Sequence, residues 1–309
     1  MDEVTRHILE KLNHPGLFEA LAQRLTAAEL NTLLLEVFNQ RLTGQSAPAL
    51  LNKYIGNRLV KPAAVDVIRL REEELQTYRL LAGAGFEPVE LSPVTQLGAS
   101  TGVAPVNQKK VLSALRGTEV QSDPTNAIAL HYAHLKKSGR PGSGLHRFCC
   151  IGRMLRTSFH ANPAYTPHFT VAALVTLGPT TADAAFEKHA LHEHVAAHEQ
   201  VCREVYGIGP LHLEVIPHQG HTATHPFLTA CLEGLPASMP VTFRPPETGK
   251  GYYYGFQVKV MAYIGGVAQE VGDCGPVSWT QQLLQDKKER MFISGLGAQL
   301  LHHFRMAKQ

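Results

Sequence analysis

The segment from Arg116 to Gly178 places the strongest constraint on the fold, because polar turns alternate in it with two apolar runs. A polar turn, Gln121–Thr125, is followed by a helical pattern over residues 126–137. The apolar runs Arg147–Arg156 and His168–Leu177 predict two strands joined by a long polar loop. A chain with this pattern is expected to build its core around a sheet.

An arginine, Arg156, stands where the first of these strands is predicted to end. The planar guanidinium group can clamp a carboxylate or a phosphate with two parallel hydrogen bonds. Arginines at strand ends are also common on protein surfaces, where they only close a hairpin. The residue type alone therefore leaves both interpretations open.

Composition narrows the class of protein. A chain of 309 residues with 44% hydrophobic content can bury a full core. The formal net charge is +3 and no run of lysine or arginine exceeds two residues, so we do not expect a nucleic-acid partner. The apolar runs are far shorter than the roughly 18 residues that cross a bilayer. Five cysteines, an odd number, fit a reducing cytosol, so we expect a cytoplasmic protein without membrane association.

Residues 1–60 read as a helical region of their own. Thr26–Glu29 has the spacing of a capping box, and apolar side chains recur at helical spacing after it. Such a stripe is typical of a core or of a docking face, so these helices are expected to provide a site for a protein partner if they do not pack on the rest of the chain. Nothing in this region indicates catalysis.

The remainder alternates helices and strands. The pattern over 67–82 predicts a helix that Gly83 and Gly85 end, followed by a strand at 86–93. The later elements are predicted as a helix at 181–205, strands at 211–216, 252–263, 267–271 and 291–297, and helices at 279–285 and 298–306.

The order of these parts resembles the three motifs of class II aminoacyl-tRNA synthetase catalytic cores. The helix and strand at 67–93 are similar to the first motif, Cys150–Arg156 to the second, and the Gly295-Leu-Gly297 strand and helix to the third. The resemblance spans residues 67–309 and implies an α+β fold. That fold would be an antiparallel β-sheet flanked by helices, here with the N-terminal helical appendage.

The histidyl branch of that family provides the nearest match. Gln121–Thr125 resembles the Arg-Pro-Glu-x-Thr turn that holds an amino acid's ammonium group, and Tyr252–Gly255 resembles the Tyr-Tyr-Thr-Gly strand. Phe169 stands where the family places an aromatic ring against adenine. The resemblance implies a catalytic role for Arg156 and ligand-binding roles for Asp123, Thr125, Phe169, Tyr252, Tyr253, Gly295 and Gly297.

Several departures bear on ATP chemistry. Ser158 replaces the glutamate that would read the adenine amino group, and Leu300 replaces the arginine that would bind the terminal phosphates. The Gly-Gly-Arg-Tyr-Asp signature is replaced by Gly272–Pro276, and the chain ends soon after the third motif, so we expect no anticodon-binding domain. Glu270 and Asp273 are the nearby candidates to hold magnesium. The cofactor is therefore left open between ATP with magnesium and none.

Histidine is abundant, with 17 in the chain. His194 and His198 stand four residues apart on one helical face, which suits a metal site or a solvated surface; because the acidic companion of a His-Glu-x-x-His motif is missing, we assign no metal. The loop residues His218, His221 and His225 are expected near the pocket mouth, as a base or as turn caps.

Two functional classes remain. The first is a synthetase paralogue that binds an amino acid or a related small molecule in a regulatory or subunit role, similar to the histidyl-like regulatory subunit of ATP phosphoribosyltransferase. The second is an ATP-dependent ligase that activates an amino acid for tRNA or another acceptor. In either case the resemblance implies a homodimer paired through residues 67–93.

Overall fold

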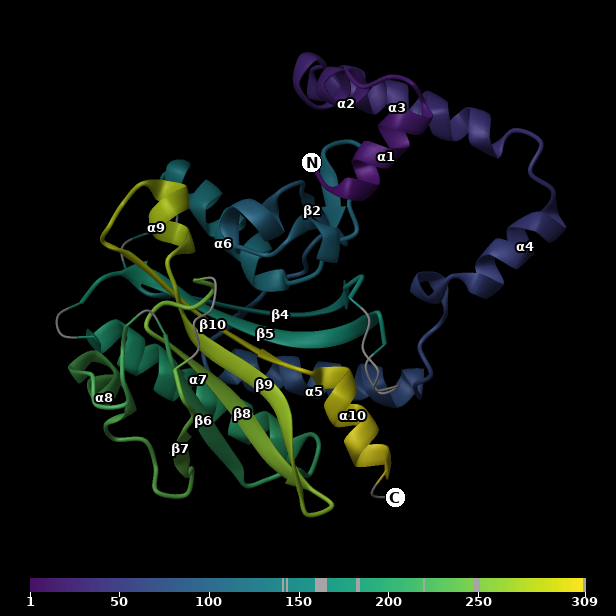
Figure 1. Cartoon of the computed structure of the whole chain (residues 1–309). Coiled ribbons are helices and arrows are strands. Elements are labelled where there is room, and N and C mark those ends of the chain that lie inside the picture. Colours follow the sequence, from purple (N-terminus) through teal and green to yellow (C-terminus); the bar gives the residue numbers. More distant parts are fainter. Residues whose placement is uncertain are drawn as a thin grey trace.

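The centre of the molecule is an eight-stranded sheet with the strand order β1-β4-β5-β10-β9-β8-β6-β7 (Figure 1). The computed structural model describes residues 1–140, 142, 144–158, 166–181, 184–218, 220–246 and 251–307. The six central strands pair antiparallel, whereas the edge pairs β1–β4 and β6–β7 are parallel. The predicted α+β fold, with an antiparallel sheet at its centre, is therefore confirmed.

The strands of this sheet are β1 (Glu87–Pro88), β4 (His146–Leu155), β5 (His168–Pro179), β6 (Leu211–Pro217), β7 (Val241–Phe243), β8 (Phe256–Ile264), β9 (Val267–Val277) and β10 (Glu289–Leu296). A separate two-stranded sheet joins β2 (Val94–Gln96) to β3 (Thr118–Val120). The helices are α1 (Glu3–Lys11), α2 (Leu17–Glu19), α3 (Ala27–Leu42), α4 (Ala47–Gly56), α5 (Val67–Gly83), α6 (Pro124–Lys137), α7 (Ala185–Glu204), α8 (Pro226–Leu232), α9 (Trp279–Leu284) and α10 (Ala298–Ala307).

Helices cover both faces of the sheet (Figure 1). The face covered by α6 and α9 is called the front face, and the face covered by α5, α7, α8 and α10 the back face. Alternation along β4 sends Phe148 and Cys150 into the front core and Cys149 and Ile151 into the back core. The two adjacent cysteines are thus buried on opposite faces, as the strand period predicts.

The N-terminal helices α1 to α4 lie outside these two layers (Figure 1). The predicted capping box begins α3, where Thr26 N donates to Glu29 Oε2 at 2.8 Å and Glu29 N donates to Thr26 Oγ1 at 3.3 Å. Neither α3 nor α4 buries a side chain. Contact with the region around β3 runs through a Lys109–Asp2 ion pair and through Arg116 N, which donates to Asn31 Oδ1 at 2.7 Å.

Two predicted strands differ from the structure, and one helix was not predicted. The strand expected at 86–93 is limited to Glu87–Pro88, since a proline cannot donate to the ladder. Tyr252 to Tyr254 precede β8 instead of opening it, because Gly255 turns the chain with φ +73°. The helix α8 was not expected; His225 Nδ1 accepts from Phe227 N at 3.3 Å and caps it.

None of the helices in the described ranges combines the length and the apolar character that a membrane crossing requires.

Candidate functional site

Two adjoining cavities open on the front face, with volumes of about 500 and 250 Å³. They share five wall residues: Asp123, Arg156, Tyr252, Tyr253 and Asp273. Every residue for which the sequence predicted a catalytic or ligand-binding role lines the smaller cavity. The structure thus brings together side chains from the start of α6, the end of β4, the beginning of β5, the bend before β8 and the end of β10.

Asp123 is the N-cap of α6. Its Oδ1 accepts from Thr125 N at 2.9 Å and from Thr125 Oγ1 at 2.7 Å, and its Oδ2 accepts from Tyr252 OH at 2.6 Å. Pro124 follows at the first helical position, where a missing N–H costs nothing. The turn that the sequence assigned to an ammonium group is therefore also the device that begins this helix.

The bend at Tyr252 and Tyr253 links two carboxylates. Tyr252 donates to Asp123, while Tyr253 OH donates to Asp273 Oδ2 at 2.9 Å. Gln257 Nε2 donates to the same Oδ2 atom at 2.9 Å. Burial next to these carboxylates raises the pKa of both tyrosines well above the usual range, so each phenol keeps its proton and remains a donor.

Glycine at 275 leaves room for this arrangement. A Cβ at Gly275 would lie 2.6 Å from Cδ1 of the Tyr253 ring and 2.8 Å from the carbonyl oxygen of Phe256. Any larger residue would push the Tyr253 ring out of its place beside Asp273.

Arg156 extends from the end of β4 toward both cavities. Its Nε donates to the carbonyl of Ser122 at 3.0 Å, and its guanidinium carbon stands 5.2 Å from the centroid of the Phe169 ring. The backbone N of Arg156 donates to Pro167 O at 2.8 Å, which closes the base of the loop. The predicted arginine and aromatic ring are thus neighbours, in a cation–π arrangement.

The Gly295–Gly297 turn is held by an irregularity in β9. The register between β8 and β9 shifts between Val260 and Met261, which leaves Val271 without an opposite partner. Its carbonyl accepts from Gly297 N at 2.9 Å, at the point where β10 passes into α10. Leu300 stands in the first turn of that helix, at the position of the missing phosphate-binding arginine.

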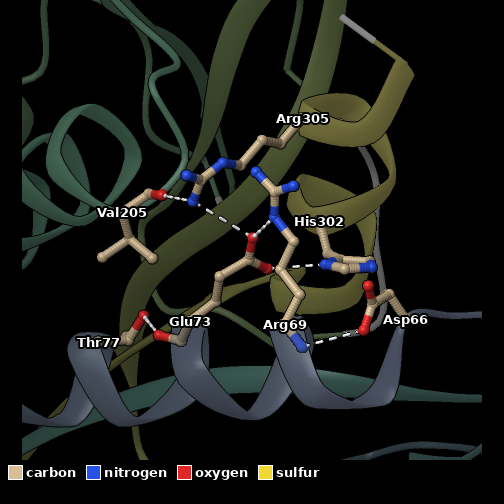
Figure 2. Close-up of polar contacts among 7 residues, drawn as sticks. All are labelled: Asp66, Arg69, Glu73, Thr77, Val205, His302 and Arg305. Atoms are coloured by element: carbon tan, nitrogen blue, oxygen red, sulfur yellow. Dashed lines mark hydrogen bonds and ion pairs between the residues drawn. The ribbon is translucent and has the colours of Figure 1, made fainter. Parts of the chain in front are cut away.

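The nearest arginine on α10 does not replace it. Arg305 points to the back face, where it pairs with Glu73 at 3.3 Å and donates to the carbonyl of Val205 (Figure 2). The same figure shows Arg69 and His302 around the Glu73 carboxylate. Arg305 is therefore committed to a structural cluster on the opposite side of the sheet.

The carboxylates considered for magnesium have other partners. Glu270 pairs with Lys259 at 2.7 Å, and Asp273 accepts from Tyr253 and Gln257. Within the described part of the chain, histidine, cysteine and carboxylate side chains nowhere gather in threes that could hold a metal ion.

His194 and His198 are interior residues, so a solvated face was the wrong expectation. Both are fully buried: His194 Nδ1 contacts Ser294 Oγ at 2.8 Å, and His198 Nε2 contacts the same oxygen at 3.0 Å. His194 Nε2 also contacts Thr176 Oγ1 at 2.9 Å. Burial lowers the pKa of His194 well below its usual value and that of His198 to about 3, so both are neutral.

The histidines of the loop after β6 divide between two roles. His218 lines the larger cavity, as expected for a residue near the pocket mouth. His225 caps α8, and its ring packs against His221 with centroids 4.1 Å apart.

Several wall residues had no assigned role in the sequence. Gln257 and Lys110 line the larger cavity, and Asp273, considered only for magnesium, lines both. The alternation of β8 does mark Gln257 as a polar position between the buried Phe256 and Val258, which is the signal that could have revealed it. No such alternation marks Asp273, because it follows the half-buried Gly272.

Several solved structures have the same fold. Histidyl-tRNA synthetase of S. aureus matches with a TM-score of 0.61 and 14% identity, over 82% of this chain and 70% of that one. A Bacillus halodurans protein described as an ATP phosphoribosyltransferase regulatory subunit/histidyl-tRNA synthetase matches with a TM-score of 0.58 and 13% identity. The match covers 77% of this chain and 79% of that one. Pyrrolysyl-tRNA synthetase of Desulfitobacterium hafniense matches with a TM-score of 0.52 and 16% identity. The match covers 99% of this chain and 90% of that one.

No protein-family model and no curated protein sequence matches the chain. The structural likenesses show that residues of this chain adopt the class II aminoacyl-tRNA synthetase fold. At these identities the likeness concerns the fold alone.

Proposed function

We propose that this protein binds an amino acid or a closely related small molecule in the front-face cavities and acts in a regulatory or subunit role, without efficient ATP-dependent adenylation. The observation that carries the proposal is the contrast between Arg156, which lines the cavities, and Arg305, which is held on the back face. One of the two cation positions that an activating enzyme needs is present, and the other is not.

The wall shared by the two cavities suits a zwitterion. It holds one cation, Arg156, together with the carboxylates of Asp123 and Asp273. An amino acid presents both charges within a few bonds, so its carboxylate can pair with Arg156 and its ammonium group with Asp123. Charged hydrogen bonds of this kind are worth roughly 1.5–3 kcal/mol each.

Adenylation needs more than this wall provides. A triphosphate carries charge at its α-phosphate and at its β,γ end, and transfer requires cations at both. Arg156, beside the Phe169 ring, serves the first position. Leu300 stands at the second, and an arginine contact worth about 3 kcal/mol corresponds to roughly two orders of magnitude in rate.

The second candidate function is an ATP-dependent ligase that activates an amino acid for tRNA or for another acceptor. It is favoured by the pairing of Arg156 with Phe169, which leaves a base-stacking position beside a phosphate-binding cation. Proteins described as histidyl- and pyrrolysyl-tRNA synthetases share the fold.

Pyrophosphate exchange over the twenty amino acids, run beside calorimetric binding, separates the two candidates. We expect binding of at least one amino acid with exchange about a hundredfold below ordinary synthetase rates, and we expect Leu300→Arg to raise exchange. Asp123→Asn should weaken binding by roughly 1.5–3 kcal/mol without unfolding α6, since asparagine is an equally good N-cap. Ordinary exchange rates in the unmodified protein would establish the ligase instead.

The proposed assembly is a homodimer. The helix α5 exposes Val67, Ile68 and Leu75, an apolar set that a second copy would cover. Sedimentation at micromolar concentration should give the mass of a dimer, and Ile68→Glu should shift it toward a monomer. The exposed apolar side chains of α3 and α4 are proposed to bind a protein partner.

A further inference from the structure

The two carboxylates of the cavity wall differ in how their charges are balanced. Asp123 stands at the N-terminus of the 14-residue helix α6, whose dipole offsets part of its negative charge. Asp273 lies within the strand β9. Its two hydrogen bonds, from Tyr253 and Gln257, both fall on Oδ2 and both come from neutral groups.

The charged groups around Asp273 make its environment more negative. Burial raises the pKa of Asp273, and the negative charges of Glu270 and Asp123 raise it further. Lys259 is the register partner of Asp273 across β8 and β9, but its ammonium group is paired with Glu270 at 2.7 Å. These neighbours together leave one negative charge beside the cavities unmatched.

Two further cations line the cavity without cancelling that charge. Arg156 is held toward Ser122 by its Nε and lies over Phe169. Lys110 lines the larger cavity from an exposed position, where water screens its charge. Both are placed to meet an anionic group of a ligand, and neither forms an ion pair with Asp273.

Each of the two carboxylates is bonded by its own tyrosine. Tyr252 donates to Asp123 and Tyr253 donates to Asp273, with the ring centroids of the two tyrosines 4.8 Å apart. A ligand with two cationic groups can therefore place one at each carboxylate.

We propose that Asp273 binds a second cationic group of the ligand, so that the ligand is a basic amino acid whose side chain ends in an amine or guanidinium. This inference rests on the proposed amino-acid binding and adds the ligand class to it. The α-ammonium group meets Asp123, the carboxylate meets Arg156, and the side-chain cation fills the place of the missing counter-charge at Asp273. Asp273 is thereby the residue that determines specificity.

Calorimetry with a matched ligand pair tests the inference on the full chain. Lysine and 6-hydroxynorleucine have side chains of the same length, and only lysine ends in a cation. We expect lysine to bind roughly 10- to 100-fold more tightly, with ornithine and arginine also preferred over leucine and glutamate. In Asp273→Asn the lysine preference should fall to within about threefold, whereas the same change at the exposed Asp286 should leave it intact.

Each outcome bears on one of the two proposals. Equal binding of lysine and 6-hydroxynorleucine overturns the role of Asp273 and leaves amino-acid binding in place. A lysine preference that survives in Asp273→Asn overturns it as well. Absence of binding by every amino acid tested removes the proposed function and this inference together. Circular dichroism of the variant establishes that it is folded before binding is measured.

Discussion

Two carboxylates on opposite faces of one sheet show how differently the chain treats buried charge. On the back face, Glu73 is 2% exposed and has three basic side chains around it: His302 Nδ1 at 2.8 Å, Arg305 at 3.3 Å and Arg69 at 3.5 Å (Figure 2). On the front face, Asp273 faces the neutral donors Tyr253 and Gln257. A charge that the protein neutralises itself belongs to the fold, and one that it leaves to neutral donors beside a cavity is available to a ligand.

The Glu73 cluster also explains why the third motif can lack its arginine function without losing its fold. Arg305 and His302 belong to α10, while Glu73 and Arg69 belong to α5. Their ion pairs fasten the helix of the third motif to the helix of the first. Arg305 and His302 of α10 thus serve packing, whereas Arg156 lines the cavities on the other face.

Removing the charge of Glu73 on the back face should have the largest effect on stability. We expect Glu73→Gln to lower the free energy of unfolding by about 3 kcal/mol, because it leaves the partly buried Arg69 and Arg305 without their carboxylate partner. Urea denaturation measures the loss. The exposed neighbour Glu72 provides the control, since Glu72→Gln should stay within about 0.5 kcal/mol of the unmodified protein. Equal stability of the two variants would contradict the structural role of the cluster.

The second-largest effect should be a loss of stability in acid, caused by a histidine of the same back face. His198 titrates near pH 6.5 in the unfolded chain but has its pKa lowered to about 3 by burial, so acid protonates the unfolded state first. Stability contributed above pH 6.5 is therefore lost as the pH falls, by about 1.4 kcal/mol per unit for each such histidine. Unfolding free energies between pH 7 and 5 should show this slope, and His198→Gln should reduce it; an unchanged slope would exclude His198 as its source.

Replacing the front-face carboxylate Asp273 should change the stability least, and it should raise the stability at pH 7 instead of lowering it. Burial raises the pKa of Asp273, so its ionised form is disfavoured in the folded state, and the stability it contributes in acid is lost as the pH rises through that pKa. Asp273→Asn keeps an acceptor for Tyr253 and Gln257 and removes the charge. We expect a gain within about 1 kcal/mol at pH 7 and no gain at pH 3, by thermal denaturation. A clear loss at pH 7 would make Asp273 a structural residue like Glu73.

The residues of the candidate site could be predicted from the sequence because each motif is recognised from neighbouring residues, and the order of the motifs persists at low identity. Asp123, Arg156 and Phe169 each belong to a turn or a strand end that is legible from neighbouring residues. Their convergence on one cavity follows once the strands are placed in a class II sheet.

The other residues of the site and of the core could not be predicted, because their roles depend on contacts between distant segments of the chain. Gln257 meets Asp273 across β8 and β9, a pairing set by register and not by either sequence alone. Likewise, the four-residue spacing of His194 and His198 is the same for a metal site, a wet face or an interior network. Only the position of Ser294, about a hundred residues on, distinguishes them.

That interior network has a fixed sense. Ser294 has one hydroxyl hydrogen, and His198 Nδ1 has no partner among the described residues, so a hydrogen there would be a buried unsatisfied donor. His198 therefore carries its hydrogen on Nε2 and donates it to Ser294 Oγ, and the Ser294 hydroxyl donates to His194 Nδ1. His194 then carries its own hydrogen on Nε2 and donates a hydrogen bond to Thr176 Oγ1. The donors lead from His198 on α7 to Ser294 on β10, back to His194 on α7 and on to Thr176 on β5, and none can reverse without the others. The tautomer of His194 thus follows from the unpartnered Nδ1 atom of His198.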